Sequence, residues 1–150
     1  MNCRLAWLLA AAALAGCAQS PATPPQAPLL ETYWRPVEIE GVPVPARPGT
    51  REPNLMLSTG GNLVLPGGAN RVQGFTGCNN VSGAFERDAA RLHFKPLATT
   101  RMACLPANDI EERYLSALNA TASQRVTGKV LELLDAEGKV RMRLEARGLE

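Results

Sequence analysis

The stretch from Arg71 to Asp88, RVQGFTGCNNVSGAFERD, constrains the fold of this chain more than any other part of the sequence. It is rich in residues that favour strands, namely Val72, Phe75, Val81 and Phe85. Glycines interrupt it at short intervals, at Gly74, Gly77 and Gly83. A glycine within a strand indicates a bulge, a bend or a close approach of another backbone segment. The stretch therefore predicts strands that are bulged or bent.

The other strand-like segments suggest an antiparallel arrangement. Residues 52–68 contain two apolar runs on either side of Gly60-Gly61, which predicts a hairpin. The C-terminal part predicts another hairpin, in which RVTGKVLELLD turns at AEGK into KVRMRLEA, with apolar and polar residues alternating along the last strand. Near the start, TYWRPVEIEG favours a strand, but Pro36 cannot donate to a ladder. We expect that strand to lie at an edge or to be bulged at Pro36.

One helix is predicted within residues 106–123, PANDIEERYLSALNATAS. Asn108 can cap it, and Glu111 stands three residues later, where a capping box requires Glu or Gln. One stripe at helical spacing is apolar and is expected to face the core. Its members are Ile110, Tyr114, Ala117, Leu118 and Ala122.

The N-terminal residues predict export rather than structure. Residues 1–16 combine Arg4, a short apolar run and small residues, which is typical of a signal peptide. Leu14 to Cys17, LAGC, resembles the bacterial lipobox, which implies that Cys17 becomes the lipidated first residue of the mature protein. Ala18 then implies sorting to the outer membrane, with the domain in the periplasm. Residues 17–28 include four prolines and are expected to form a tether, so the folded domain spans residues 29–150.

Only two cysteines, Cys78 and Cys104, remain after export and lipidation. An even pair in an oxidising compartment is most simply a disulfide. Two alternatives stay open at this point. A nucleophilic thiolate would need His93, the only histidine, as its base. A zinc site could combine Cys78, Cys104 and His93, although no closely spaced ligand pair is present in the sequence.

Several segments together resemble the META-domain (HslJ-like) family of heat-shock lipoproteins. They are YWRPVEIEG, GFTGCNNVSGAF, LATTRMAC, YLSAL and LELLDAEGKVRMRLEA, and the resemblance covers residues 30–147. It implies an α+β fold, a strongly bent antiparallel sheet or partial barrel with one main helix packed against it. It also implies that a bridge between Cys78 and Cys104 ties the sheet to the segment before the helix. The family signature falls on Trp34, Gly77, Asn79, Thr100, Arg101 and Met102. Pro36 and Leu105 depart from the family pattern.

The sequence indicates no catalytic residue, metal site or cofactor. No serine lies in a G-x-S-x-G pattern, and the glycine pairs precede strands rather than the helix start that would bind phosphate. The carboxylate pairs are interpreted as solvated surface residues, namely Glu38 with Glu40 and Glu111 with Glu112. Asn79 and Asn80 are interpreted as turn residues.

These observations favour a non-enzymatic envelope lipoprotein, a stress-related binding or assembly module at the outer membrane. Its expected partners are the membrane, through lipidated Cys17, and an unidentified envelope protein or ligand. Nucleic acid is not expected, because 16 Lys/Arg and 14 Asp/Glu are spread evenly along the chain. The alternatives are a membrane-face small-ligand carrier or hydrolase, and a patch on anionic polymers formed by Arg141, Arg143 and Arg147.

Overall fold

The computed structural model describes residues 25–46, 48–59, 70–104 and 109–148. The strands are β1 (Tyr33–Ile39), β2 (Val42–Pro43), β3 (Asn54–Thr59), β4 (Asn70–Phe75), β5 (Asn80–Asp88), β6 (Arg91–Phe94), β7 (Ala98–Thr99), β8 (Ser123–Thr127), β9 (Val130–Leu134) and β10 (Val140–Arg147). The single helix of the described residues, α1, spans Asp109–Ala120 between β7 and β8. The expected signal peptide, Cys17 and most of the tether lie outside these residues.

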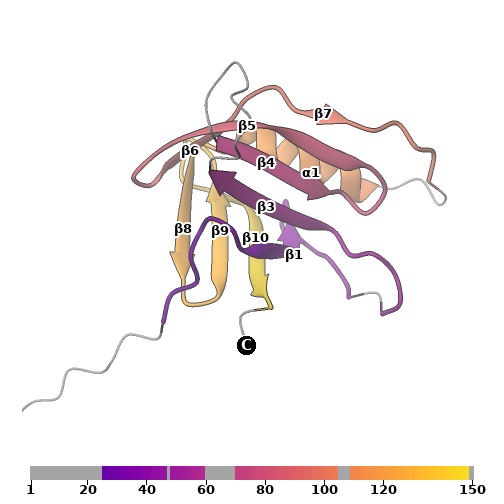
Figure 1. Cartoon of the computed structure of the whole chain (residues 1–150), viewed down its shortest axis with the longest axis horizontal. Helices are drawn as coiled ribbons and strands as arrows, with labels where there is room; N and C mark the ends of the chain where they lie inside the picture. Colours follow the sequence, from indigo (N-terminus) through magenta and orange to yellow (C-terminus); the bar gives the residue numbers. More distant parts are fainter. Residues whose placement is uncertain (1–24, 47, 60–69, 105–108, 149–150) are drawn as a thin grey trace, which may run out of the picture.

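Eight of the strands form a closed antiparallel barrel. Their order is β1, β10, β9, β8, β6, β5, β4 and β3, and β3 pairs with β1 again to close the ring. The predicted α+β class with an antiparallel sheet and one helix is confirmed, but the barrel is closed rather than partial. In Figure 1, β4 and β5 cross in front of α1, β3 runs below them, and β8, β9 and β10 run steeply in the lower part of the view. Only β2 and β7 of the described strands pair on one side alone.

The hairpins predicted from the sequence differ in part from the strand connections in the structure. The predicted hairpin at AEGK is confirmed between β9 and β10. The segment predicted as one strand before it, RVTGKVLELLD, is itself a hairpin, because the chain turns at Gly128, whose φ is 57°. Glycine at the first central position suits a type II′ turn. The hairpin predicted at Gly60-Gly61 falls on residues 60–69, which lie outside the described residues.

Pro36 is accommodated by a bulge within a paired strand. The register between β1 and β10 shifts between Pro36 and Glu38, so the predicted bulge is confirmed. The alternative expectation, an edge strand, is wrong because β1 pairs with β10 on one side and with β2 and β3 on the other. Pro36 itself is in register with Leu144, and Val37 is the residue left out, so the ladder is interrupted directly after the residue that has no N–H.

The helix packs one stripe into the barrel core. Tyr114, Ala117 and Leu118 are fully buried, as predicted, among residues that include Trp34 and Met142. The Tyr114 hydroxyl donates a hydrogen bond of 2.7 Å to the carbonyl of Asn54, the first residue of β3. Burial raises the pKa of Tyr114 far above its ordinary value, so the phenol stays neutral. No described helix is both long enough and apolar enough to cross a membrane.

Candidate functional site

The turn between β4 and β5 positions the first part of the site. Gly77 has a φ of 103°, a conformation that favours glycine. The Thr76 N–H donates to the Asn79 carbonyl at 2.9 Å, and the Asn79 N–H donates to Thr76 Oγ1 at 2.9 Å. Both residues are buried, with 0% and 4% of their surface exposed. Neither Asn79 nor Asn80 has a positive φ, so the left-handed tolerance expected of them is not used.

The Asn79 side chain reaches a segment far away in the sequence. Its Oδ1 accepts a hydrogen bond of 2.7 Å from the Met102 N–H, and its Nδ2 donates at 3.3 Å to the Met102 carbonyl. The side-chain amide therefore contacts the Met102 backbone as a neighbouring strand would. Asn79 does lie in a turn, but interpreting it as a turn residue alone misses this contact.

Thr100 and Glu111 complete the hydrogen bonding of Asn79. The Thr100 hydroxyl donates to Asn79 Oδ1 at 2.8 Å and accepts from the Asn80 N–H at 3.0 Å. The Glu111 carboxylate, in the first turn of α1, accepts from Asn79 Nδ2 at 3.0 and 3.1 Å and from Thr76 Oγ1 at 3.0 Å. We call Thr76, Asn79, Thr100, Met102 and Glu111 the Asn79 cluster.

Glu111 was interpreted from the sequence as a solvated surface carboxylate and as part of a capping box, and the structure corrects the first interpretation. It is not simply a solvated surface carboxylate, because it is half-buried and bonds Asn79 and Thr76. Its predicted capping box with Asn108 lies outside the described residues. An anion in the first helical turn is favoured by the helix dipole, which adds to the three hydrogen bonds from Asn79 and Thr76.

The predicted disulfide between Cys78 and Cys104 is formed, with a Cα–Cα distance of 5.9 Å. The alternatives of a nucleophilic thiolate and a zinc site are therefore wrong, because both sulfurs are bonded to each other. His93 lies exposed on β6 opposite Glu86. The bridge fixes the segment after β7 to the β4–β5 turn, one residue from Asn79.

The structure separates the family-signature residues into two groups. Gly77, Asn79, Thr100 and Met102 meet in or beside the Asn79 cluster, and Arg101 is exposed next to it. Trp34 is fully buried in the barrel core, where its Nε1–H donates to the Leu29 carbonyl at 3.0 Å. Trp34 therefore stabilises the barrel, while the other signature residues shape one surface.

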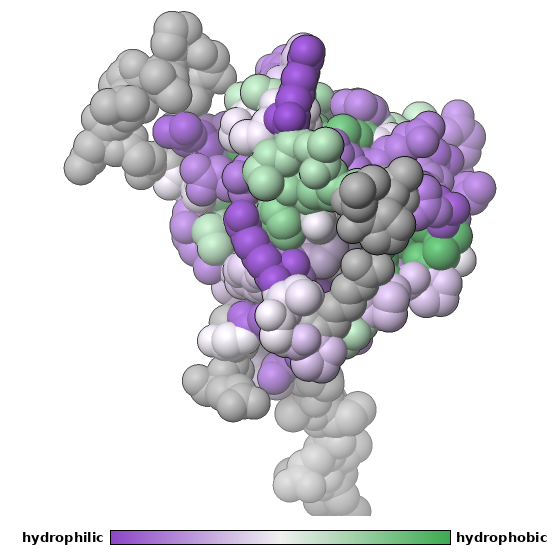
Figure 2. Space-filling model, turned by 90° about the vertical axis from the view of Figure 1, so that its right-hand side faces the viewer, coloured by the Kyte–Doolittle hydropathy of each residue, from purple (hydrophilic) through white to green (hydrophobic). Residues whose placement is uncertain are grey.

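That surface carries a shallow hollow. The hollow, about 470 Å³ in volume, is lined by the disulfide, Met102, Leu115, Glu111 and Glu112. Met102 is 63% exposed although its backbone is held firmly by Asn79. Figure 2 shows the side of the molecule that lies at the right of Figure 1, and apolar atoms gather in its middle between hydrophilic side chains.

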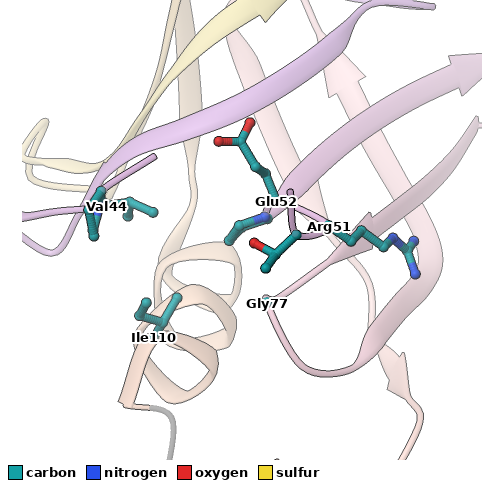
Figure 3. A pocket seen from close by; sticks show the side chains of 8 residues that line it. Val44, Arg51, Glu52, Gly77 and Ile110 are labelled. Atoms are coloured by element: carbon teal, nitrogen blue, oxygen red, sulfur yellow. The ribbon is translucent and has the colours of Figure 1, made fainter. Parts of the chain in front are cut away.

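A second, smaller pocket was not expected from the sequence. It measures about 180 Å³, and Val44 faces Ile110 of α1 across it (Figure 3). Glu52 on its wall forms an ion pair with buried Arg35, whose Nε lies 3.1 Å from Glu52 Oε2. Arg51 points away from Val44 and Ile110, and its guanidinium stacks 4.0 Å above the Phe75 ring. No sequence motif could reveal this pocket, because its residues come from three distant segments.

Ion pairs cover the outer face of β1, β8, β9 and β10. They join Glu38 to Arg143 at 3.2 Å, Arg143 to Glu132 at 3.1 Å, Glu132 to Arg125 at 2.6 Å, and Glu40 to Arg141 at 2.7 Å. We call these six residues the ion-pair ladder. Partial burial opposes ionisation of Glu132, but the hydrogen bonds from Arg125 and Arg143 outweigh it and lower its pKa. Arg141 and Arg143, two of the three arginines considered as a patch for anionic polymers, are therefore paired with carboxylates.

The described residues define a class of protein: a small antiparallel barrel with one helix, in which a disulfide links the β4–β5 turn to the segment that follows β7. The chain belongs to the META-domain family, whose model matches residues 27–148. It is also similar to the NMR structure of a protein from Burkholderia xenovorans, with 24% identity, a TM-score of 0.59, and coverage of 88% of this chain and 99% of the other.

Another NMR structure matches with 22% identity, a TM-score of 0.54, and coverage of 76% of this chain and 87% of the other. At these identities the two structures support the fold alone. No curated protein sequence is significantly similar to this chain.

Proposed function

We propose that this META domain is a non-enzymatic binding or assembly module, held by lipidated Cys17 at the periplasmic face of the outer membrane and related to stress tolerance. The observation that supports binding is the Asn79 cluster. A buried amide, a helix carboxylate and a disulfide all stabilise one exposed surface segment, residues 98–104. A preorganised surface binds with a smaller entropic cost than a mobile one.

The side chains of the cluster favour binding over catalysis. The Glu111 carboxylate is engaged by an amide and a hydroxyl that hold it in place, and both sulfurs are in the disulfide. A general acid or base needs a free position from which to exchange a proton with a substrate. Each polar group of this cluster instead positions another part of the chain.

The test is chemical crosslinking in intact cells of the lipidated protein, with Cys17→Ser as the control. The proposal expects a discrete protein adduct that depends on the anchor. If the Cys17→Ser protein fractionates with the membrane as the wild type does, the anchor assignment is wrong. If the same adducts form without the anchor, or none form, the proposed envelope function fails.

A second candidate is a small-ligand carrier, which the pocket between Val44 and Ile110 favours. A cavity of about 150 Å³ can hold a benzene-sized group, and this pocket, about 180 Å³, is of that order, with apolar Val44 and Ile110 and charged Glu52 in its lining. Ile110→Trp would fill it. Mass spectrometry of the lipid extract of the purified wild-type protein should show a copurifying molecule. The extract of the variant should lack it.

A further inference from the structure

Each of the strands β2 and β7 pairs with a neighbour on one side alone. Their free edges differ in the backbone groups that they expose. Directly after β2, the Val44 N–H donates to the Val37 carbonyl at 2.8 Å, so the backbone groups at Pro43 and Pro45 face away from β1. Proline has no N–H and cannot extend a ladder. The free edge of β2 is therefore blocked in the way that natural sheets protect their edges.

The free edge of β7 carries no such block. The Thr100 N–H donates to the Asn80 carbonyl at 3.1 Å, so the alternate groups at Thr99 and Arg101 face away from β5. Both residues retain an N–H. Ala98, Arg101 and Ala103 are exposed, and in Figure 1 β7 lies along the upper margin of the molecule, with β5 on one side and no labelled strand on the other.

This unblocked edge is also held rigid. Asn79 replaces a strand partner for Met102, Thr100 bonds both Asn79 and Asn80, and Cys104 is cross-linked to Cys78. We propose that the outer edge of residues 98–103 binds an extended peptide segment of another protein by strand addition. The inference depends on the proposed binding function and assigns its site and the class of its partner.

The side chains on this edge specify the chemistry of the peptide. Arg101 pairs with no carboxylate of the described residues, so an acidic residue complements it. Met102 is exposed beside the hollow formed with Leu115 and the disulfide, which suits an apolar residue. Neighbouring residues of a strand point to opposite faces, so the peptide alternates acidic and apolar residues. If two copies of this edge paired antiparallel about Arg101, the two Arg101 side chains would lie opposite each other. Repulsion between like charges disfavours that pairing.

To test this, random linear peptides displayed on phage are selected for binding to the full lipidated chain in detergent micelles. The affinity of the selected peptides is then compared for the wild type, Thr99→Pro and Thr99→Ala. Thr99→Pro removes one outward N–H that has no partner in the barrel, and Thr99→Ala is the matched control that keeps it. We expect Thr99→Ala to bind the selected peptides within about twofold of wild type and Thr99→Pro to bind at least about tenfold more weakly. Thermal unfolding verifies that both variants fold. Arg101→Glu should change the selected residues from acidic to basic.

Several outcomes would overturn the inference: no selectable peptide, equal binding to Thr99→Pro, or binders whose amide-exchange footprint avoids residues 98–103. A dimer in sedimentation velocity that Thr99→Pro dissociates would make the occupant a second copy of this chain. Photocrosslinkers placed in cells at Arg101 and at Val42 separate the two proposals. Adducts from Val42 alone leave the binding function standing and reject the β7 site, whereas no adduct at either position, or by chemical crosslinking, rejects both.

Discussion

The Asn79 cluster and the ion-pair ladder both join segments that are distant in sequence, but they lie in different surroundings. The cluster centres on Asn79, which is 4% exposed, whereas the ladder lies on the outer barrel face, where the Arg143 side chain is 39% exposed. Buried polar groups that lose their partners are costly, while exposed ion pairs exchange their partners for water. We therefore expect the ion-pair ladder, although it includes more residues, to stabilise the fold less than the buried Asn79 amide does.

The largest effect is expected from the disulfide, which links the cluster to the segment after β7. Replacing both Cys78 and Cys104 by serine should lower the free energy of unfolding by about 3 to 4 kcal/mol, because the bridge closes a long loop in the unfolded chain. Urea denaturation of the oxidised wild type and the double variant measures this loss. Thiol titration of the denatured wild type without reductant should show no thiol from this pair. A loss below about 1 kcal/mol would contradict the assigned role of the bridge.

Removing the central amide should have the next largest effect. Asn79→Ala leaves the Met102 backbone and the Glu111 carboxylate without their partner, and we expect a loss of about 3 kcal/mol. Asn80→Ala is the matched control, since Asn80 is the adjacent exposed asparagine and should change stability by less than about 0.5 kcal/mol. Equal effects of the two substitutions in urea denaturation would mean that the turn, rather than the side-chain network, is what matters.

A smaller effect is expected from Glu111→Gln, which keeps the shape of the side chain. The new amide has one acceptor oxygen instead of two, and its NH₂ faces the NH₂ of Asn79, so we expect a loss of about 1 to 2 kcal/mol. Glu112→Gln, on the exposed neighbouring position, should be close to neutral. Thermal unfolding of both variants distinguishes a cluster residue from a general charge effect on the helix.

The ladder should be less sensitive to substitution. Arg143→Ala removes the contacts to Glu38 and Glu132, but we expect a loss of no more than about 1 kcal/mol, shrinking further at high salt. Denaturation at low and high ionic strength tests this. A larger loss, insensitive to salt, would show that the ladder is as important as the Asn79 cluster.

The ladder should also contribute a small dependence on pH. The pKa of Glu132 is lowered in the folded protein, so its ionised form stabilises the fold. That contribution is present above the ordinary carboxyl pKa of 4.5 and is lost as the pH falls through the lower folded value. The difference in stability between wild type and Glu132→Gln should therefore diminish on acidification through this range. A difference that grows instead would contradict the direction of the shift.

Local patterns in the sequence predicted the elements better than their connections. The helical stripe around Tyr114 and the alternation along β10 are periodic, so the helix and the last strand were predictable. The turn at Gly128 was missed because one glycine between strand-like runs is a weak signal without the register. Closure of the barrel rests on pairings such as Trp34 with Leu55, which no local pattern encodes.

The candidate site was predictable only in part. The resemblance singled out Asn79, Thr100 and Met102 and implied the bridge, but a turn-forming asparagine and a solvated glutamate were the ordinary interpretations of Asn79 and Glu111. Their contact spans 32 residues of sequence and depends on where α1 packs. The pocket between Val44 and Ile110 depends on tertiary packing in the same way.

Amide hydrogen exchange of residues 99–102 tests most directly the claim that this edge is rigid on one side and free on the other. The Thr100 and Met102 N–H groups donate within the molecule, while those of Thr99 and Arg101 face outward. We expect slow exchange at Thr100 and Met102, fast exchange at Thr99 and Arg101, and loss of the Met102 protection in Asn79→Ala. Fast exchange at Met102 in the wild type, or slow exchange at Arg101, would contradict it.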